Sequence, residues 1–116
     1  MYYGDESARN LIIEGTQGDA TLRSFMNWED IKNNPETQKL LAHYQKLGRF
    51  RANHPAIGAG KHQKIEGEIY TFSRVFVKGD YTDKVVVAID APKGSKTISV
   101  GSIFENGITL KDAYSG

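Results

Sequence analysis

This 116-residue chain has three histidines and two pairs of adjacent acidic residues, which are side chains of types that can bind a metal ion or transfer protons. His43, His54 and His62 are eleven and eight residues apart, whereas zinc ligands normally include a closely spaced pair. The acidic pairs at positions 5–6 and 29–30 are adjacent residues, so their spacing does not predict the two facing carboxylates of a glycosidase. The chain has no cysteine, which excludes disulfides and thiolate catalysis. From the residues alone we predict no catalytic or metal centre.

One glycine-rich segment, Gly-Ala-Gly-Lys at residues 58–61, has part of the pattern of a phosphate-binding loop. That motif needs another glycine five residues before Gly60 and a hydroxyl residue after the lysine, but Pro55 and His62 occupy these positions. A calcium loop around residues 80–83 lacks the alternating acidic spacing and the closing glutamate. The sequence therefore predicts neither site.

The composition is that of an ordinary soluble domain, with 39% hydrophobic and 25% charged residues. A formal net charge of +1 creates no global field toward nucleic acid or an anionic membrane. Charge is nevertheless segregated, because residues 1–36 carry seven acidic and three basic side chains, whereas residues 37–65 carry six basic and no acidic ones. Such a basic segment could bind nucleic acid, but it is more often a surface that faces the acidic one. The longest apolar run, residues 85–89, is far shorter than the roughly 20 residues that span a bilayer.

Capping and periodicity predict one long helix over residues 35–53. Asn34 can accept hydrogen bonds from the first turn, Pro35 needs no amide partner there, and Glu36 complements the helix dipole. Pro55 disfavours helical geometry at the preceding residue, so the helix should end at residue 52 or 53. Its apolar stripe, which must pack on the rest of the fold, consists of Leu40, Leu41, Tyr44 and Leu47.

From residue 57 onward the hydrophobic period changes to two, and glycines separate short runs rich in strand-forming residues. This spacing is typical of an antiparallel β-sandwich. The run 85–89 is apolar on both faces, so we expect it to be the central strand, with hairpin loops at residues 79–83 and 91–95. The predicted strands cover residues 61–66, 68–77, 84–91, 97–100 and 108–110.

The first third of the chain predicts little regular structure. Residues 1–3 are strand-like, and residues 5–18 mix turn residues with a single short apolar run, as in a long loop. The predicted fold is therefore α+β, with one helix packed on an antiparallel β-sandwich and a loop-like N-terminal third.

Four short segments, taken in their order along the chain, form a further pattern. Tyr-Tyr-Gly-Asp-Glu occupies residues 2–6, and Arg-Ser-Phe-Met-Asn-Trp occupies residues 23–28. His-Pro-Ala follows the predicted helix at residues 54–56, and Asp-Ala-Tyr-Ser-Gly closes the chain at residues 112–116. In this order the segments resemble the end of an α-amylase superfamily glycoside hydrolase, although Phe25 stands where that family usually has proline.

The resemblance implies that residues 1–56 are the end of a (β/α)8 barrel, with the remnant of strand 8, a loop and the last barrel helix. Residues 57–116 would be the C-terminal antiparallel β-sandwich domain. In such enzymes the catalytic carboxylates lie on earlier barrel strands. The chain would thus be a structural, catalytically incompetent part of a retaining α-glucan hydrolase, with no cofactor of its own; a calcium ion could sit upstream in the parent enzyme.

The resemblance also implies candidate substrate-binding residues in the parent enzyme. A sugar cleft would be bordered by hydrogen-bonding and stacking side chains from the loop after strand 8, namely Tyr3, Asp5, Glu6, Arg23 and Trp28. The alternative is structural: Glu6 and Arg23 would brace the loop and the barrel, and Trp28 would pack against the last helix.

A second hypothesis is a carbohydrate-binding β-sandwich module. Its aromatic area would come from Tyr70, Phe72, Phe76, Tyr81 and Tyr114, although the first three share a parity that favours the core. The expected partner of the parent enzyme is an α-glucan or maltooligosaccharide. We expect no nucleic acid and no membrane as partners, a monomeric chain, and a secreted or cell-surface parent more than a cytoplasmic one.

Overall fold

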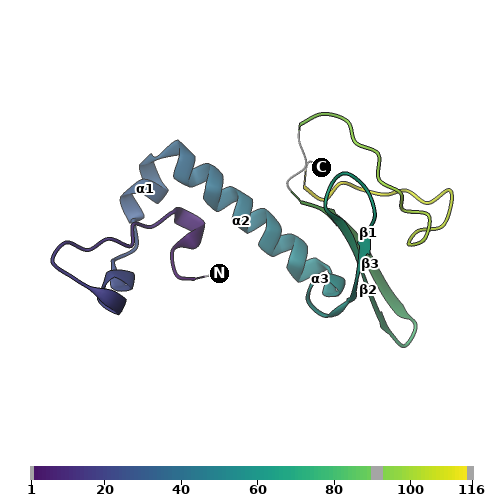
Figure 1. Ribbon diagram of the computed structural model, residues 1–116, viewed down its shortest axis with the longest axis horizontal. Coiled ribbons are helices and arrows are strands. Elements are labelled where there is room, and N and C mark those ends of the chain that lie inside the picture. Colours follow the sequence, from purple (N-terminus) through teal and green to yellow (C-terminus); the bar gives the residue numbers. More distant parts are fainter. Residues whose placement is uncertain (1, 90–92, 115–116) are drawn as a thin grey trace. The chain divides into compact units, whose positions relative to one another are not determined.

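The computed structural model describes residues 2–89 and 93–114 (Figure 1). The chain divides into two compact units, Met1–Gly48 and Arg49–Gly116, and the division falls inside the longest helix. Within the described residues, no helix is long and apolar enough to cross a membrane. The predicted domain boundary between residues 56 and 57 stays a prediction.

The N-terminal unit starts with two 3-10 helices, η1 (Asp5–Ser7) and η2 (Gly18–Arg23). The strand expected at residues 1–3 is not formed by its described residues, because the chain turns at once: the Asp5 N–H donates to the Tyr2 carbonyl at 3.2 Å. Gly4 takes a φ of 86° in this turn, which ends any extended segment. Residues 8–17 contain neither helix nor strand, in keeping with the predicted loop.

The predicted long helix is confirmed as α2 (Pro35–Asn53). The Asn34 Oδ1 accepts a hydrogen bond from the Glu36 N–H at 2.9 Å, as the capping pattern predicts. The helix ends before His54, whose extended backbone (φ −124°, ψ 91°) is the geometry favoured before a proline. The packing of its apolar stripe on a sheet stays a prediction.

Two short helices flank α2 and were not predicted. α1 (Trp28–Asn33) precedes it, and α3 (Pro55–Ala59) follows it directly. Proline suits the first turn of a new helix, because the missing N–H has no partner there. The same proline that ends α2 therefore begins α3.

The C-terminal unit contains one antiparallel sheet with the strand order β1-β2-β3. Its strands are β1 (Lys61–Ile65), β2 (Thr71–Lys78) and β3 (Tyr81–Ala88). β2 and β3 are joined by the two-residue turn Gly79-Asp80, with Lys78 opposite Tyr81. Gly79 has a φ of 59°, a conformation that glycine adopts without steric cost.

Several strand predictions are wrong. β2 is the central strand, and the apolar run 85–89 belongs to β3 at the edge. β2 starts at residue 71 rather than 68, because residues 66–68, Glu-Gly-Glu, are poor strand formers. β3 already starts at residue 81, so the hairpin loop is shorter than expected.

The β-sandwich is not confirmed, because the described residues form a single three-stranded sheet. Residues 97–100 and 108–110 are not strands. These runs of four and three residues find no partner strand, and an unpaired strand leaves its backbone groups without hydrogen bonds. Residues 91–92 of the expected loop and the closing residues 115–116 lie outside the described residues.

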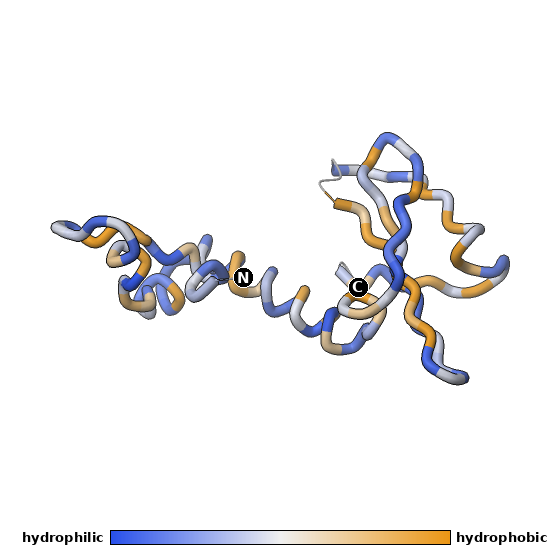
Figure 2. Tube along the Cα trace, turned by 60° about the horizontal axis from the view of Figure 1, so that its bottom comes forward, coloured by the Kyte–Doolittle hydropathy of each residue, from blue (hydrophilic) through white to orange (hydrophobic). Residues whose placement is uncertain are grey.

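The core of the C-terminal unit explains why an edge strand is apolar on both faces. α3 covers one face of the sheet, to which Arg74 and Asp83 project, and residues 103–105 and 108 lie over the other, to which Lys84 projects. Figure 2 shows apolar residues along the β2–β3 hairpin and polar residues at its turn. The buried apolar side chains of the described residues are Ala56, Val85 and Ile103.

Candidate functional site

The N-terminal unit is organised around the buried guanidinium of Arg9. It donates to the Tyr3 carbonyl from Nε at 3.1 Å and from Nη2 at 2.9 Å. It also donates to the Leu22 carbonyl at 3.1 Å and the Ser24 carbonyl at 2.7 Å, and to the Ser24 hydroxyl. We call Arg9 and these three carbonyls the Arg9 hub. The hub fixes the turn at residues 2–9 against the segment that contains Arg23.

Gly4 is a steric requirement of the Arg9 hub. A Cβ at this position would lie 2.5–2.8 Å from the Nε, Cβ and Cδ atoms of Arg9, closer than real Cβ contacts. The backbone also has a positive φ, which side chains rarely adopt. Only glycine lets the arginine lie directly against the turn.

A second contact joins η1 to the start of α1. The Ser7 hydroxyl donates to the Asn27 Oδ1 at 2.7 Å, and the Asn27 Nδ2 donates to the Ser7 carbonyl at 2.9 Å. Because Asn27 directly precedes Trp28, this reciprocal pair fixes the N-terminus of α1 beside η1.

The predicted residues Tyr3, Asp5 and Glu6 lie together in the turn. The Tyr3 ring lies under the Arg9 guanidinium, 4.7 Å from its centroid to the central carbon. The Asp5 carboxylate accepts the Tyr2 N–H at 2.6 Å, so it is committed to the turn. One Glu6 carboxylate oxygen is buried without a hydrogen-bond partner among the described residues.

The other two predicted residues, Arg23 and Trp28, come from the segment that the Arg9 hub and the Ser7–Asn27 pair hold in place. Arg23 is exposed at the end of η2, and Trp28 is 68% exposed at the start of α1. No hydrogen bond, ion pair or ring contact given for the described residues joins any two of the five predicted side chains. The unit thus fixes the backbone around these residues and leaves the side chains of Arg23 and Trp28 exposed.

Arg9, Ser7 and Asn27 are the organising residues that sequence reasoning missed. One signal was present: Arg9 is the sole basic residue of the first 22. Such an isolated arginine is a candidate for binding backbone carbonyls, since its planar group carries five donors. The serine and asparagine carry no comparable signal, because both are common in loops.

The exposed side chains of this unit offer groups that can bind a sugar. Exposed aromatic rings such as that of Trp28 can stack on an apolar sugar face, and the exposed Arg23 guanidinium can donate hydrogen bonds to sugar hydroxyls. In the part of the chain that the structure describes, no group of three potential metal-binding side chains occurs.

In the C-terminal unit, α3 is held at both ends by charged side chains of the sheet. The Asp83 carboxylate accepts the Ala56 N–H at 2.9 Å at the start of α3. At its end, Arg74 donates to the carbonyls of Ala56 at 3.0 Å and Gly60 at 2.8 Å. We call this arrangement the α3 clamp. It gives the His-Pro-Ala segment a structural role, because Ala56 becomes completely buried.

The electrostatics of the clamp centre on Asp83. Its Oδ1 lies 2.9 Å from His54 Nδ1, and its side chain is almost completely buried. Burial alone would raise the pKa of Asp83, but the hydrogen bonds from His54 and the Ala56 N–H, together with the charge of His54, lower it below the usual aspartate value. The carboxylate is therefore kept ionised, and the backbone of α3 depends on it.

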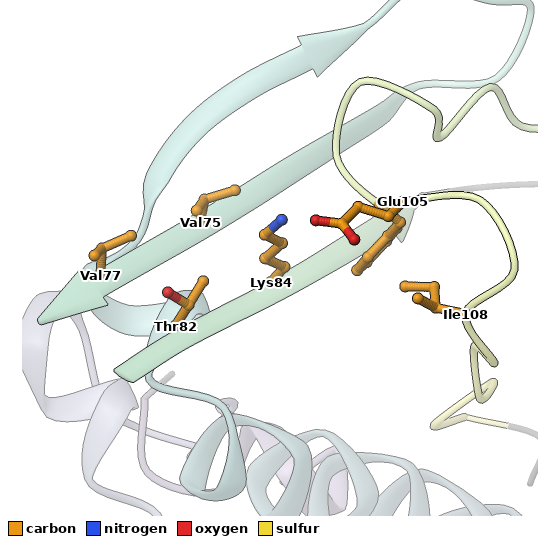
Figure 3. Close-up of a pocket in the computed structure, with 7 residues that line it drawn as sticks. Val75, Val77, Thr82, Lys84, Glu105 and Ile108 are labelled. Atoms are coloured by element: carbon orange, nitrogen blue, oxygen red, sulfur yellow. The ribbon is translucent and has the colours of Figure 1, made fainter. Parts of the chain in front are cut away.

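A broad pocket lies on the opposite sheet face, with a volume of about 650 Å³ (Figure 3). Lys84 projects into it from β3 and donates to the Ile103 carbonyl at 2.9 Å, which ties the C-terminal segment to the sheet. Because the lysine is already used in this way, the pocket is best explained as the space under that segment. Its lining residues are Val75, Val77, Thr82, Lys84, Phe104, Glu105 and Ile108.

The aromatic residues of the second hypothesis form two groups on the sheet. Tyr70, which is 51% exposed, lies beside Phe72 with ring centroids 6.0 Å apart, and the Phe72 ring lies 4.7 Å from that of His62. Phe76 and Tyr81 form the other group, at 6.3 Å. Tilts of 33° to 63° between the rings of each pair make neither group a flat platform. The remaining candidate, Tyr114, lies in the C-terminal segment.

The comparisons with known proteins point to one class, the α-amylases. Over 87 residues, or 75% of this chain, the sequence is 39% identical to the periplasmic alpha-amylase of Escherichia coli (strain K12). The chain spans only 12% of the length of that relative. No family model matches the chain, and no solved structure matches it. The chain is thus related to an amylase, over most of its own length and a small part of the relative's.

Proposed function

We propose that this chain is the C-terminal part of an α-amylase-like glycoside hydrolase that acts on α-glucans. It would supply the end of the barrel and the domain that follows, while the catalytic carboxylates would lie elsewhere in the enzyme. The similarity to an alpha-amylase over 75% of the chain carries this proposal, and the order of the four sequence segments supports it. Because the relative is described as periplasmic, we also propose that the parent enzyme is exported.

Within this function, the N-terminal unit would border the sugar cleft. Its support is that the Arg9 hub and the Ser7–Asn27 pair fix the backbone on both sides of Arg23 and Trp28 while the two side chains stay exposed. The indole of Trp28 would stack on a glucose ring, and the exposed guanidinium of Arg23 would donate hydrogen bonds to sugar hydroxyls.

A chimera tests the proposal directly. The 87 matching residues of the Escherichia coli relative are replaced by those of this chain, and hydrolysis of a chromogenic maltoheptaoside is measured. We expect an active chimera and no hydrolysis by the isolated chain. Turnover by the isolated chain, or a folded chimera without activity, would contradict the proposal.

The same chimera tests the binding residues. Trp28→Ala should raise KM about two- to tenfold, the value of one aromatic stacking contact. Phe25→Ala is the matched control, because Phe25 belongs to the same segment and is 96% exposed. An equal KM for both variants would favour the structural alternative for Trp28.

The half-exposed Tyr70 beside Phe72 favours one second candidate, a sugar-binding role for the C-terminal unit itself. Titration of maltoheptaose into the labelled chain, followed by NMR, should then shift the amides of Tyr70 and Phe72. Tyr70→Ala should abolish the shifts, whereas Val77→Ala, on the other face of the sheet, should retain them. Absence of shifts in the unmodified chain would reject this role.

A further inference from the structure

The two edges of the sheet differ in how they are protected. β1 is five residues long and carries two lysines, and charged side chains discourage pairing with another strand. β3 is eight residues long, has three consecutive valines at residues 85–87, and contains neither proline nor a break in its register. A long apolar edge of this kind is a template for a further strand.

The alternating hydrogen-bond pattern of an antiparallel strand shows which backbone groups of β3 are available to pair with a further strand. The Ile89 N–H donates to the Tyr70 carbonyl at 2.9 Å, so odd-numbered residues of this strand turn toward β2. The even-numbered residues Thr82, Val86 and Ala88 turn outward, and in the described part of the chain their backbone groups have no other partner. Lys84 also turns outward, but its N–H lies near the Asp83 carboxylate.

We propose that β3 pairs antiparallel with β3 of a second copy of this chain, about a two-fold axis at Val85. Two three-stranded sheets would then become one six-stranded sheet. Residues that face each other across such an axis lie on the same sheet face, so only a few alignments are possible. An axis at Asp83 or at Lys84 would oppose two like charges. An axis at Val85 places neither Asp83 nor Lys84 opposite its own copy. It also pairs residues 81–89 of one chain along their full length with residues 89–81 of the other.

This alignment also covers apolar surface that the single chain exposes. It places Tyr81 opposite Ile89 of the second copy, and by symmetry the pair occurs twice. The two side chains are 51% and 49% exposed and lie on the same face of the sheet. An aromatic residue opposite a β-branched one is a favourable cross-strand pair. The proposed dimer therefore replaces the monomer that we expected from the sequence.

The first experiment measures the mass of the full chain by light scattering and sedimentation, from micromolar to millimolar concentration. We expect a dimer that Val86→Pro converts to a monomer, because proline removes an outward N–H and is tolerated on an edge strand. Val86→Thr is the matched control, since it keeps the N–H and the β-branch. Circular dichroism checks that each variant is folded. A wild-type chain that stays monomeric throughout would overturn the proposal.

A second variant keeps the proposal testable if Val86→Pro does not fold. Tyr81→Glu leaves the backbone intact and removes two cross-strand pairs, so it should raise the dimer dissociation constant about tenfold or more. An unchanged constant would argue against the alignment at Val85.

Cross-linking tests the alignment itself, which the absence of native cysteine makes simple. With the axis at Val85, Thr82 faces Ala88 of the second copy at about 5.5 Å between Cα atoms, within reach of a disulfide. The T82C/A88C variant should form a reducible dimer, whereas T82C alone should not. Equal cross-linking of the two variants would reject this alignment.

Discussion

The N-terminal unit and the C-terminal unit are each stabilised by a different kind of internal contact. In the N-terminal unit, a single side chain, Arg9, binds three backbone carbonyls from two distant segments. In the C-terminal unit, a ladder of paired strands carries the structure, and the α3 clamp adds one helix to it. The comparison teaches that very few side chains, Arg9 foremost, can order a loop-rich region, which then depends strongly on each of them. A sheet spreads the same task over many backbone groups.

The sharpest test of this difference is Arg9→Ala. It should unfold the N-terminal unit, because three carbonyls lose their donors at about 1–3 kcal/mol each. Hydrogen exchange should lose protection over residues 2–27 and keep it in β2 and β3. Arg23→Ala, which changes an exposed arginine of the same unit, should alter stability by no more than about 0.5 kcal/mol. Equal effects of the two variants would remove the basis of the comparison.

Gly60→Ala should produce the next largest effect, now in the C-terminal unit. A Cβ there would lie 2.6 Å from the Ala56 carbonyl oxygen and 3.0 Å from the backbone of Val75. We expect a loss of about 1–3 kcal/mol in the free energy of unfolding, measured by urea titration. Gly58→Ala is the control inside α3: it meets only the end of the Arg51 side chain at 3.8 Å, and it should stabilise the helix.

Acid should loosen the α3 clamp before it affects the Arg9 hub. Since the pKa of Asp83 is lowered by folding, its contribution to stability is complete above the ordinary aspartate pKa near 3.8 and is lost as the pH falls through the lowered value. Urea titrations across this range should show the C-terminal unit weakening, and Asp83→Asn should flatten the dependence. A profile unchanged by Asp83→Asn would show that other carboxylates govern it.

The smallest expected effect is at Ala8, whose φ of 51° is the one left-handed non-glycine conformation among the described residues. Ala8→Gly should relieve strain and change stability by no more than about 1 kcal/mol in the favourable direction. Ala42→Gly in the interior of α2 should instead destabilise by about 1 kcal/mol. The midpoint temperatures of thermal unfolding of both variants check this: a higher value for Ala8→Gly and a lower one for Ala42→Gly would identify local strain at Ala8. Lower values for both would identify a general effect of glycine.

Local signals in the sequence predicted the long helix well. The effects of Asn34, Pro35 and Pro55 on the backbone reach only a few residues along the chain. The start and end of α2 could therefore be inferred from the sequence alone. The position of β3 could not be inferred in this way. Its apolar faces predict burial, but the cover comes from α3 and from residues 103–105 and 108 rather than from strands on both sides. Periodicity reports that a face is covered and does not report what covers it.

In the candidate site, too, the residues marked by local sequence segments were predicted, and a residue that acts through long-range contacts was not. Tyr3, Asp5, Glu6, Arg23 and Trp28 were identified through segments that resemble a known family, and the structure places all five in the N-terminal unit. Arg9 was missed because its partners are backbone carbonyls, which every residue has and no sequence pattern marks. Its role becomes visible only when the fold brings Leu22 and Ser24 back to residues 2–9.

The two-residue turn at Gly79-Asp80 has a consequence for the order of folding. Hairpins with short turns form within microseconds, since little chain entropy is lost in closing them. Pairing of β2 with β3 sets Arg74 and Asp83 on the same face of the hairpin before any distant contact is needed. Both ends of the binding surface for α3 are then already in place. The hairpin thus acts as a template on which residues 55–59 complete their helix, and variants that slow this turn should delay α3 as well.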